Sequence, residues 1–174
     1  MIDQILEKLK NENLLCHINR GYEDGEDHGF ILDYNKETVC IKKYDRDGFY
    51  DGIKIFWKSD IEELKYGGND LESRFKFIKN RGFNLDAVEI DISGFEKFLE
   101  SASRMFGYVS VNNDEEHNCY IGPILGHDDR YIHMVNYGNP GKMDKNHVLI
   151  AKSEVHSLDV DGVYERNLIS LQHN

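Results

Sequence analysis

The sequence repeats itself at an offset of about 93 residues, and such an internal repeat constrains the fold more than any single motif. Each copy opens with apolar residues three and four positions apart, the spacing that places them on one face of a helix. Ser93 followed by Glu96 is the pattern of a capping box, which predicts the start of the second helix. We therefore expect a helix at the beginning of each copy. The matched apolar positions are Ile2 and Phe95, Ile5 and Phe98, Leu6 and Leu99, and Leu9 and Ala102.

Short segments that predict strands follow each helix in the same order. Their apolar residues recur with the period of two that a half-buried strand requires, as at Val39 and Ile41 in the first copy and Ile132 and Met134 in the second. Tight turns separate the segments. The matched segments are 14–18 and 106–111, 29–34 and 122–127, 38–44 and 131–137, 52–57 and 147–151, and 58–64 and 152–158.

The last segment of each copy has apolar residues four and three positions apart. This spacing favours a helix, but the sequence RFKFI in the first copy also suits a strand. The whole pattern predicts a mostly β fold with minor α content, in which a small five-stranded barrel is duplicated in tandem and a helix opens each copy. The first copy spans residues 1–82, a packed linker 83–92, and the second copy 93–174. The closing positions are Leu71, Phe75 and Ile78, matched by Tyr164, Leu168 and Leu171.

The order of parts and several residues resemble the Sm-like family of SH3-like small barrels. The first motif of that family has a glycine, a hydrophobic strand that ends in an aromatic residue and an aspartate, and then a turn. Its second motif has an apolar strand followed by Arg-Gly. The resemblance implies a five-stranded barrel in each copy and RNA as the family's usual ligand. Residues similar to the first motif are Gly29, Ile31, Tyr34 and Asn35, with Gly122, Ile124, His127 and Asp128 in the second copy, and residues similar to the second are Lys58, Ser59 and Ile61, with Lys152, Ser153 and Val155.

Two departures from the family pattern weigh against RNA binding through its standard pocket. Val39 and Ile132 stand where RNA-binding members place an asparagine, and neither has a polar group that can read a base edge. The Arg-Gly pair is Lys-Ser in both copies. An RNA-binding alternative instead requires a basic rim formed jointly by four lysines. These are Lys42, Lys43, Lys58 and Lys152.

The chain is acidic, with a formal net charge of −11. Such a chain repels phosphate backbones at long range, which disfavours nucleic acid as a partner. Two loops concentrate the acidic residues, and either they are simply solvated or they dock a basic protein, whose complementary charge would speed the encounter. The residues of this predicted docking surface are Glu23, Asp24, Glu26, Asp27, Asp114, Glu115 and Glu116.

No arrangement of residues predicts catalysis, a metal site or a cofactor. His127 with Asp128 and Asp129 is the densest histidine cluster, but it lies at a predicted turn, where aspartate bonds to its own backbone. Ser59 and Ser153 recur at matched places without a histidine partner common to both copies. The three cysteines form no CxxC pair, which argues against a disulfide framework or a thiolate zinc site. We therefore expect a chain that is not an enzyme.

These observations lead to an expected function with two alternatives. The expected function is a non-catalytic binding or scaffolding module for another protein, built as a pseudo-symmetric pair, with self-association left open. The alternatives are a degenerate Sm-like RNA-binding protein and an acidic inhibitor or immunity-type protein for a basic partner. The start of the chain lacks the features of a signal peptide and no window resembles a membrane span, so we expect a soluble, cytoplasmic protein with no membrane partner.

Overall fold

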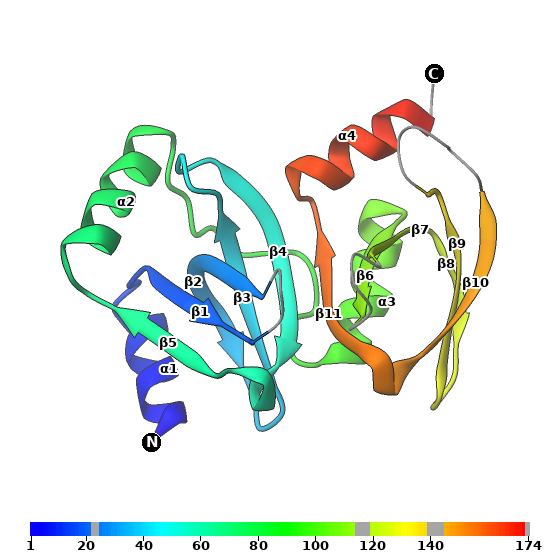
Figure 1. Ribbon diagram of the computed structural model, residues 1–174, viewed down its shortest axis with the longest axis horizontal. Helices are drawn as coiled ribbons and strands as arrows, with labels where there is room; N and C mark the ends of the chain where they lie inside the picture. Colours follow the sequence, from blue (N-terminus) through cyan, green and yellow to red (C-terminus); the bar gives the residue numbers. More distant parts are fainter. Residues whose placement is uncertain (22–24, 114–118, 139–144, 173–174) are drawn as a thin grey trace.

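The computed structural model describes residues 1–21, 25–113, 119–138 and 145–172. The second half of the chain repeats the order of elements of the first, with one strand interrupted (Figure 1). The elements of the first half are α1 (Ile2–Asn11), β1 (Cys16–Asn19), β2 (Glu26–Tyr34), β3 (Thr38–Tyr44), β4 (Tyr50–Trp57), the 3-10 helix η1 (Lys58–Asp60), β5 (Glu63–Tyr66) and α2 (Asn69–Asn80). The elements of the second half are α3 (Phe95–Phe106), β6 (Val109–Asn113), β7 (Cys119–Gly122), β8 (Ile124–His127), β9 (Tyr131–Asn136), β10 (Asn146–Ala151), η2 (Lys152–Glu154), β11 (Val155–Val160) and α4 (Val163–Gln172).

The strands form one open sheet of eight strands, in the order β5-β1-β2-β3-β4-β11-β6-β7, and one of three, in the order β10-β9-β8. Neighbouring strands are antiparallel in both sheets. The prediction of a barrel in each copy is wrong where it requires closure, because the described strands form no closed barrel. Closure would need β4 to pair with β5, or β10 with β11, but β4 and β11 pair with each other across the two halves.

The prediction of minor α content is also wrong. Helices account for 32% of the described residues and strands for 40%, so the fold is mixed α/β with mostly antiparallel strands. The difference arises at the two closing segments, which the sequence left open between helix and strand and which are the helices α2 and α4. Their buried residues include Leu71 and Ile78 in α2 and Leu168 in α4, so the helical reading of the four-and-three spacing is confirmed.

The expected strand at 122–127 is divided into β7 and β8 because Pro123, which has no N–H group, stands between them. Strand β9 and the residue after it bond to Pro123 at the bend and to β7. The Tyr137 N–H donates to the Ile121 carbonyl at 2.9 Å, and the Val135 N–H donates to the Pro123 carbonyl at 3.0 Å. The strand path therefore continues around the bend from the larger sheet into the smaller one.

Gly29 and Gly122 occupy matched positions where two strands approach closely. A Cβ atom at Gly29 would lie 2.5 Å from the carbonyl oxygen of Lys42, and one at Gly122 would meet the carbonyl oxygen of Val135 even more closely. Lys42 and Val135 are themselves separated by the repeat offset. The same backbone contact therefore requires a glycine in each half.

The predicted apolar faces of the opening helices are confirmed, since Leu6 and Leu9 of α1 and Phe98 and Leu99 of α3 are fully buried. The predicted capping box is wrong. Gly94 precedes α3 with no side-chain cap. The Ser93 hydroxyl donates to Asp91, and Glu96 pairs with Lys152 from the other end of the half.

The largest apolar cluster draws on both halves, so the halves share a core. Cys40, Ile53 and Ile55 come from β3 and β4, and the rest of the buried cluster belongs to residues 90–160. Three further clusters are separate from it: one contains Leu6 and Leu9 of α1, one lies under α2 around Phe30 and Tyr44, and the smallest includes Leu168 of α4. None of the described helices is long and apolar enough to cross a membrane.

Candidate functional site: the junction and the two open strand edges

The two halves meet where β4 pairs with β11, a contact that we call the junction (Figure 1). Ile55 lies opposite Leu158, and Ile53 lies opposite Val160. These four side chains belong to the shared apolar cluster, and none is more than 5% exposed. The junction therefore combines backbone hydrogen bonds with the burial of apolar surface, which is the main source of stability in such contacts.

Trp57, the last residue of β4, adds a polar and an aromatic contact to the junction. Its Nε1–H donates to the carbonyl of Val155 at 2.7 Å. Its ring stacks on Phe95, the first residue of α3. The partly buried Trp57 ring and its satisfied N–H tie the end of β4 to the second half.

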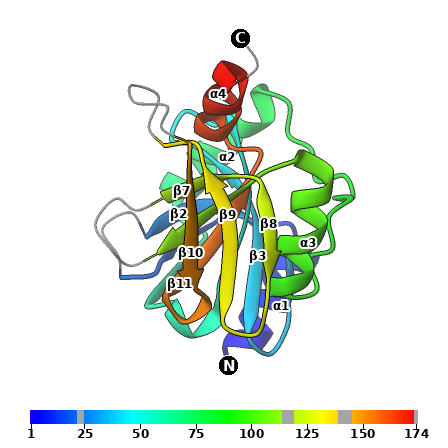
Figure 2. The ribbon, with the colours of Figure 1, turned by 90° about the vertical axis from the view of Figure 1, so that its right-hand side faces the viewer.

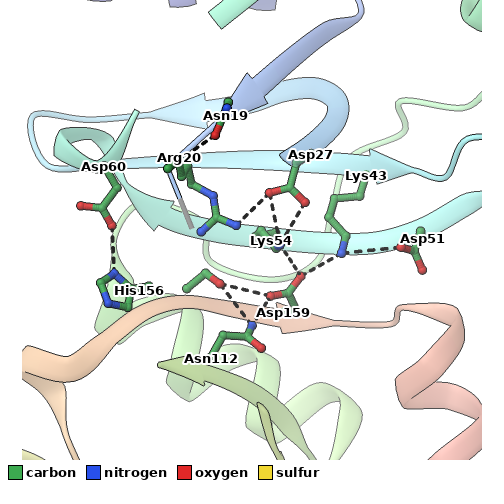
Figure 3. Close-up of polar contacts among 12 residues, drawn as sticks. Asn19, Arg20, Asp27, Lys43, Asp51, Lys54, Asp60, Asn112, His156 and Asp159 are labelled. Carbon is green, nitrogen blue, oxygen red and sulfur yellow. Dashed lines mark hydrogen bonds and ion pairs between the residues drawn. The ribbon is translucent and has the colours of Figure 1, made fainter. Parts of the chain in front are cut away.

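Four buried charged residues and a fifth that is partly buried lie beside the junction, and we call them the charged seam (Figure 3). They are Arg20, Asp27, Lys54 and Asp159, with Lys43 as the partly buried member. Asp27 of β2 accepts hydrogen bonds from Lys54 at 2.9 Å and from Arg20 at 3.0 Å. Asp159 of β11 forms ion pairs with Lys43 at 3.1 Å and with Lys54 at 3.6 Å. Lys54 thus bridges a carboxylate from each half of the chain.

Neighbouring groups complete this network. Asn112 of β6 donates to Asp159 at 2.7 Å. Lys43 also pairs with Asp51 at 3.6 Å. At the far end, His156 of β11 lies 3.5 Å from Asp60 of η1, which adds a further polar contact between the halves (Figure 3).

The charges of the seam keep one another ionised. Burial raises the pKa of Asp27, but Lys54, Arg20 and Lys43 together outweigh it and hold that pKa below its usual value. Burial lowers the pKa of Lys43, but the nearby carboxylates, Asp159 first among them, outweigh it and raise the pKa.

Glu165 of α4 behaves in the opposite way, because burial and the charge of Asp159 both raise its pKa. Its carboxyl group therefore resists ionisation, whereas the carboxylate of Asp27 is stabilised. A buried network of this kind fixes the register of β4 against β11, since a shift of one residue would separate charges that have left water. The chemistry of the seam is that of a structural contact between the halves.

The structure describes two residues of the predicted acidic docking surface, and one is exposed while the other is buried. Glu26 is exposed at the start of β2. Asp27 is buried in the charged seam, where it cannot meet a partner protein. The other five lie outside the described residues. They are Glu23, Asp24, Asp114, Glu115 and Glu116.

The four lysines of the RNA-binding alternative are each engaged within the chain. Lys42 lies over the ring of Tyr50, 5.2 Å from its centre, and Lys43 belongs to the charged seam. Lys58 pairs with Asp3 of α1 at 2.7 Å. Lys152 pairs with Glu96 of α3. Because Glu96 is the repeat counterpart of Asp3, each half has an equivalent ion pair between its opening helix and its 3-10 helix.

The positions taken from the Sm-like motifs serve the fold. Val39 and Ile132 are fully buried, so neither faces a ligand. The side-chain oxygens of Asn35 and Asp128 accept N–H groups from matched turn residues, at 2.7 and 2.8 Å in the first half and 2.7 Å in the second.

Ser59 and Ser153 lie in η1 and η2, and each hydroxyl donates to the carboxylate of the next residue at 3.2 Å. His127 pairs with Glu100 at 3.3 Å. Within the described residues no three side chains are grouped as metal ligands. A shallow, open hollow of about 630 Å³ adjoins the end of β4, and its lining residues are Ile2, Lys36, Glu37, Trp57, Lys58 and Ser59.

Followed from the larger sheet through the bend at Pro123 into the smaller one, the row of strands begins at β5 and finishes at β10, and at the bend, among the described strands, β7 pairs with β6 alone and β8 with β9 alone. In the part of the chain that the structure describes, β5 pairs with β1 alone and β10 with β9 alone. Each therefore presents a row of backbone groups to a further strand. Figure 2 shows the three-stranded sheet from outside, with β10 at its edge and α3 to one side.

Large apolar side chains are exposed at both edges. Leu149 of β10 is 64% exposed and Tyr66 of β5 is 40% exposed. His147 lies on the same face as Leu149, and its ring approaches that of His133 on β9. The sequence did not predict either edge, because the period-two pattern predicts a strand but does not show whether that strand has a neighbour on both sides.

No family model, no curated protein and no solved structure matches this chain.

Proposed function

We propose that this chain is a non-catalytic binding module that docks protein through its two open strand edges, β5 and β10. The observation that carries the proposal is that the exposed leucine of β10, Leu149, stands beside unpaired backbone groups at the end of the strand path. An edge strand that offers both backbone and apolar contacts suits strand addition, in which an incoming strand extends the sheet.

The arrangement of charge supports a protein partner over nucleic acid. The chain carries a net charge of −11, and the four lysines of the basic-rim alternative are held by contacts within the chain. A nucleic-acid site needs cations free to meet phosphates. The alternative of an acidic inhibitor or immunity-type protein for a basic partner is supported only by the acidic net charge.

We further propose that each half derives from one small-barrel unit of the Sm-like kind, opened into a shared sheet. The support is the repeated order of a helix, five strand positions and a 3-10 turn before the last strand. Matched details point the same way, since the close contact at Gly29 recurs at Gly122 and the Lys58 ion pair recurs at Lys152.

The test of the docking function is a pull-down from native lysate with the full chain as bait. We expect wild type to retain protein, with or without nuclease, and Leu149→Asp to lose it because the added charge cannot be buried at the edge. The control is Phe77→Asp, which changes an exposed apolar residue on α2 away from both edges. Nuclease-sensitive retention of RNA, or equal retention by both variants, would overturn the proposal.

A further inference from the structure

We propose that a second copy of this chain is the partner, with β10 of one chain pairing antiparallel with β5 of the next, head to tail. This inference rests on the proposed function and names the occupant of the same edges. It follows from the junction, which shows how one half of this protein binds another half.

The repeat matches the strands of the junction to the open edges. The Lys-Ser pairs of η1 and η2 align 58 with 152, so β4 corresponds to β10 and β5 corresponds to β11. In the junction Ile55 lies opposite Leu158. Their counterparts are Leu149 on β10 and Leu64 on β5, which would face each other if the same contact formed between chains.

The β10 edge exposes what the junction buries. Ile53 and Ile55 are covered by the apolar cluster of the second half, and Ile55 is fully buried. Their counterparts are His147 and Leu149, and both are exposed on the outer face of β10. A following half covers β4, whereas nothing in the described residues covers β10.

The β5 edge shows the complementary deficit. Leu158 and Val160 of β11 are fully buried at the junction. Their counterparts on β5 are Leu64, which is only half-buried, and Tyr66, which is exposed. The exposed side chains of β5 therefore lack an apolar contact that β10 of another chain would provide, and those of β10 lack one that β5 would provide.

The two ends are different surfaces, and this decides the geometry. The junction joins the edge of β4 to the edge of β11, which are two different surfaces, so the contact is heterologous. On every chain the counterpart of β4, which is β10, and the counterpart of β11, which is β5, remain unused. Two chains that repeat this contact still have one free edge of each kind. Association continues until the chains close into a ring or extend as a filament.

The contact between chains would lack the charged seam. The counterparts of Lys54 and Asp159 are Val148 and Lys65, and the counterpart of Asp27 is Tyr120. Backbone pairing and apolar contact therefore provide the attraction, so we expect the assembly to depend only weakly on salt.

One matched pair opposes the contact and makes a sharp test. The His156–Asp60 contact of the junction has Glu62 and Glu154 as its counterparts, and both are exposed. Two carboxylates placed there repel each other. Glu62→His would restore the junction pair and should tighten association by up to about fivefold, the range of an exposed ion pair.

The first experiment measures mass by light scattering and native mass spectrometry over a range of chain concentrations. We expect multiples of 20.3 kDa, a shift toward the monomer for Leu149→Asp, a shift toward larger species for Glu62→His, and no change for Phe77→Asp. A monomer at every concentration would overturn the proposal.

The second experiment fixes the orientation by disulfide trapping. Leu64→Cys and Leu149→Cys are made as separate chains, each with Cys119→Ser so that the exposed native thiol is absent. Directly opposed residues of antiparallel strands lie within the Cα separation that a disulfide spans. Head-to-tail pairing traps a dimer only when the two proteins are mixed. Dimers trapped from either protein alone, or no dimer, would contradict it.

These results separate the inference from the proposed function. A monomeric chain whose Leu149→Asp variant still loses a protein in the pull-down would contradict the second copy and leave the docking function intact. A monomeric chain that retains no protein, or retains it equally in all variants, would contradict both.

Discussion

Trp57 and Phe95 stack with their ring centres 4.5 Å apart and their planes 11° from parallel. Trp57 ends β4, one of the two junction strands, and Phe95 begins α3, so the stack joins the end of the junction to the helix that opens the second half. Because both rings also contact the shared cluster, the stability of each half depends on the other.

The Trp57 and Phe95 rings should be energetically coupled. We expect Trp57→Leu and Phe95→Leu each to lower the free energy of unfolding, and the double variant to lower it by about 1 kcal/mol less than the sum, as for other stacked aromatic pairs. Urea unfolding of the four proteins of this cycle checks the value. Strict additivity would show that the two rings make no specific contact.

Asp27 and Glu26 form a matched pair for testing the charged seam. Asp27→Asn removes the carboxylate charge that Arg20 and Lys54 share in a buried site, so we expect a loss of about 3 kcal/mol in the free energy of unfolding. Glu26→Gln changes the adjacent exposed residue and should stay within about 0.5 kcal/mol of wild type. Urea unfolding at pH 7 compares the two, and equal stabilities would contradict the seam.

Glu165 should weaken folding at neutral pH. Its pKa is raised in the folded protein by burial and by Asp159, so the folded state holds its proton more tightly than the unfolded chain does. Stability therefore falls as pH rises above the unfolded value of about 4.3. Glu165→Gln stays neutral, so it should be more stable than wild type at pH 7 and lose this advantage in acid below that value.

The Glu165→Gln prediction is compared with a control variant at an exposed carboxylate. Glu89→Gln removes an exposed carboxylate from the segment between α2 and α3 and should leave the stability unchanged at both pH values. The comparison is made by thermal and urea unfolding between pH 3 and pH 8. A difference between Glu165→Gln and wild type that is constant over this range would show that ionisation is not its cause.

Gly122 and Gly126 test the close strand contact. Gly122→Ala places a methyl group against the Val135 carbonyl, so we expect a loss of about 2 kcal/mol or more from overpacking and backbone strain. A methyl group at Gly126 meets nothing within 4 Å, so Gly126→Ala should be nearly neutral. Thermal unfolding measures both. Equal effects would mean that the contact does not require glycine.

Sequence patterns predicted most of the local structure. The apolar faces of α1 and α3 were predicted because helical spacing places Leu6 and Leu99 on the buried side of each helix. Period-two alternation located β3 and β9 in the same way. The closing segments were ambiguous because short apolar runs suit both a helix and a strand, and packing over residues such as Phe30 made α2 a helix.

The candidate site was not predictable in the same way. Asp27 lies in an acidic stretch that suggested an exposed loop, but Arg20, seven residues earlier, and Lys54, 27 residues later, make it a buried ion-pair partner. Charge composition cannot show this, because the energy of a carboxylate depends on which cations the fold brings within about 4 Å.

The sequence by itself determined the repeat, the order of helices and strands, and the faces that they bury, because each of these depends on the spacing of residues along a short segment. Only the tertiary structure decided that β4 pairs with β11 and that β5 and β10 stay open. Strand edges carry backbone groups that are alike in every sequence, so the choice of partner depends on side-chain contacts between distant segments. Those contacts bury Ile55 in the junction and leave its counterpart Leu149 exposed.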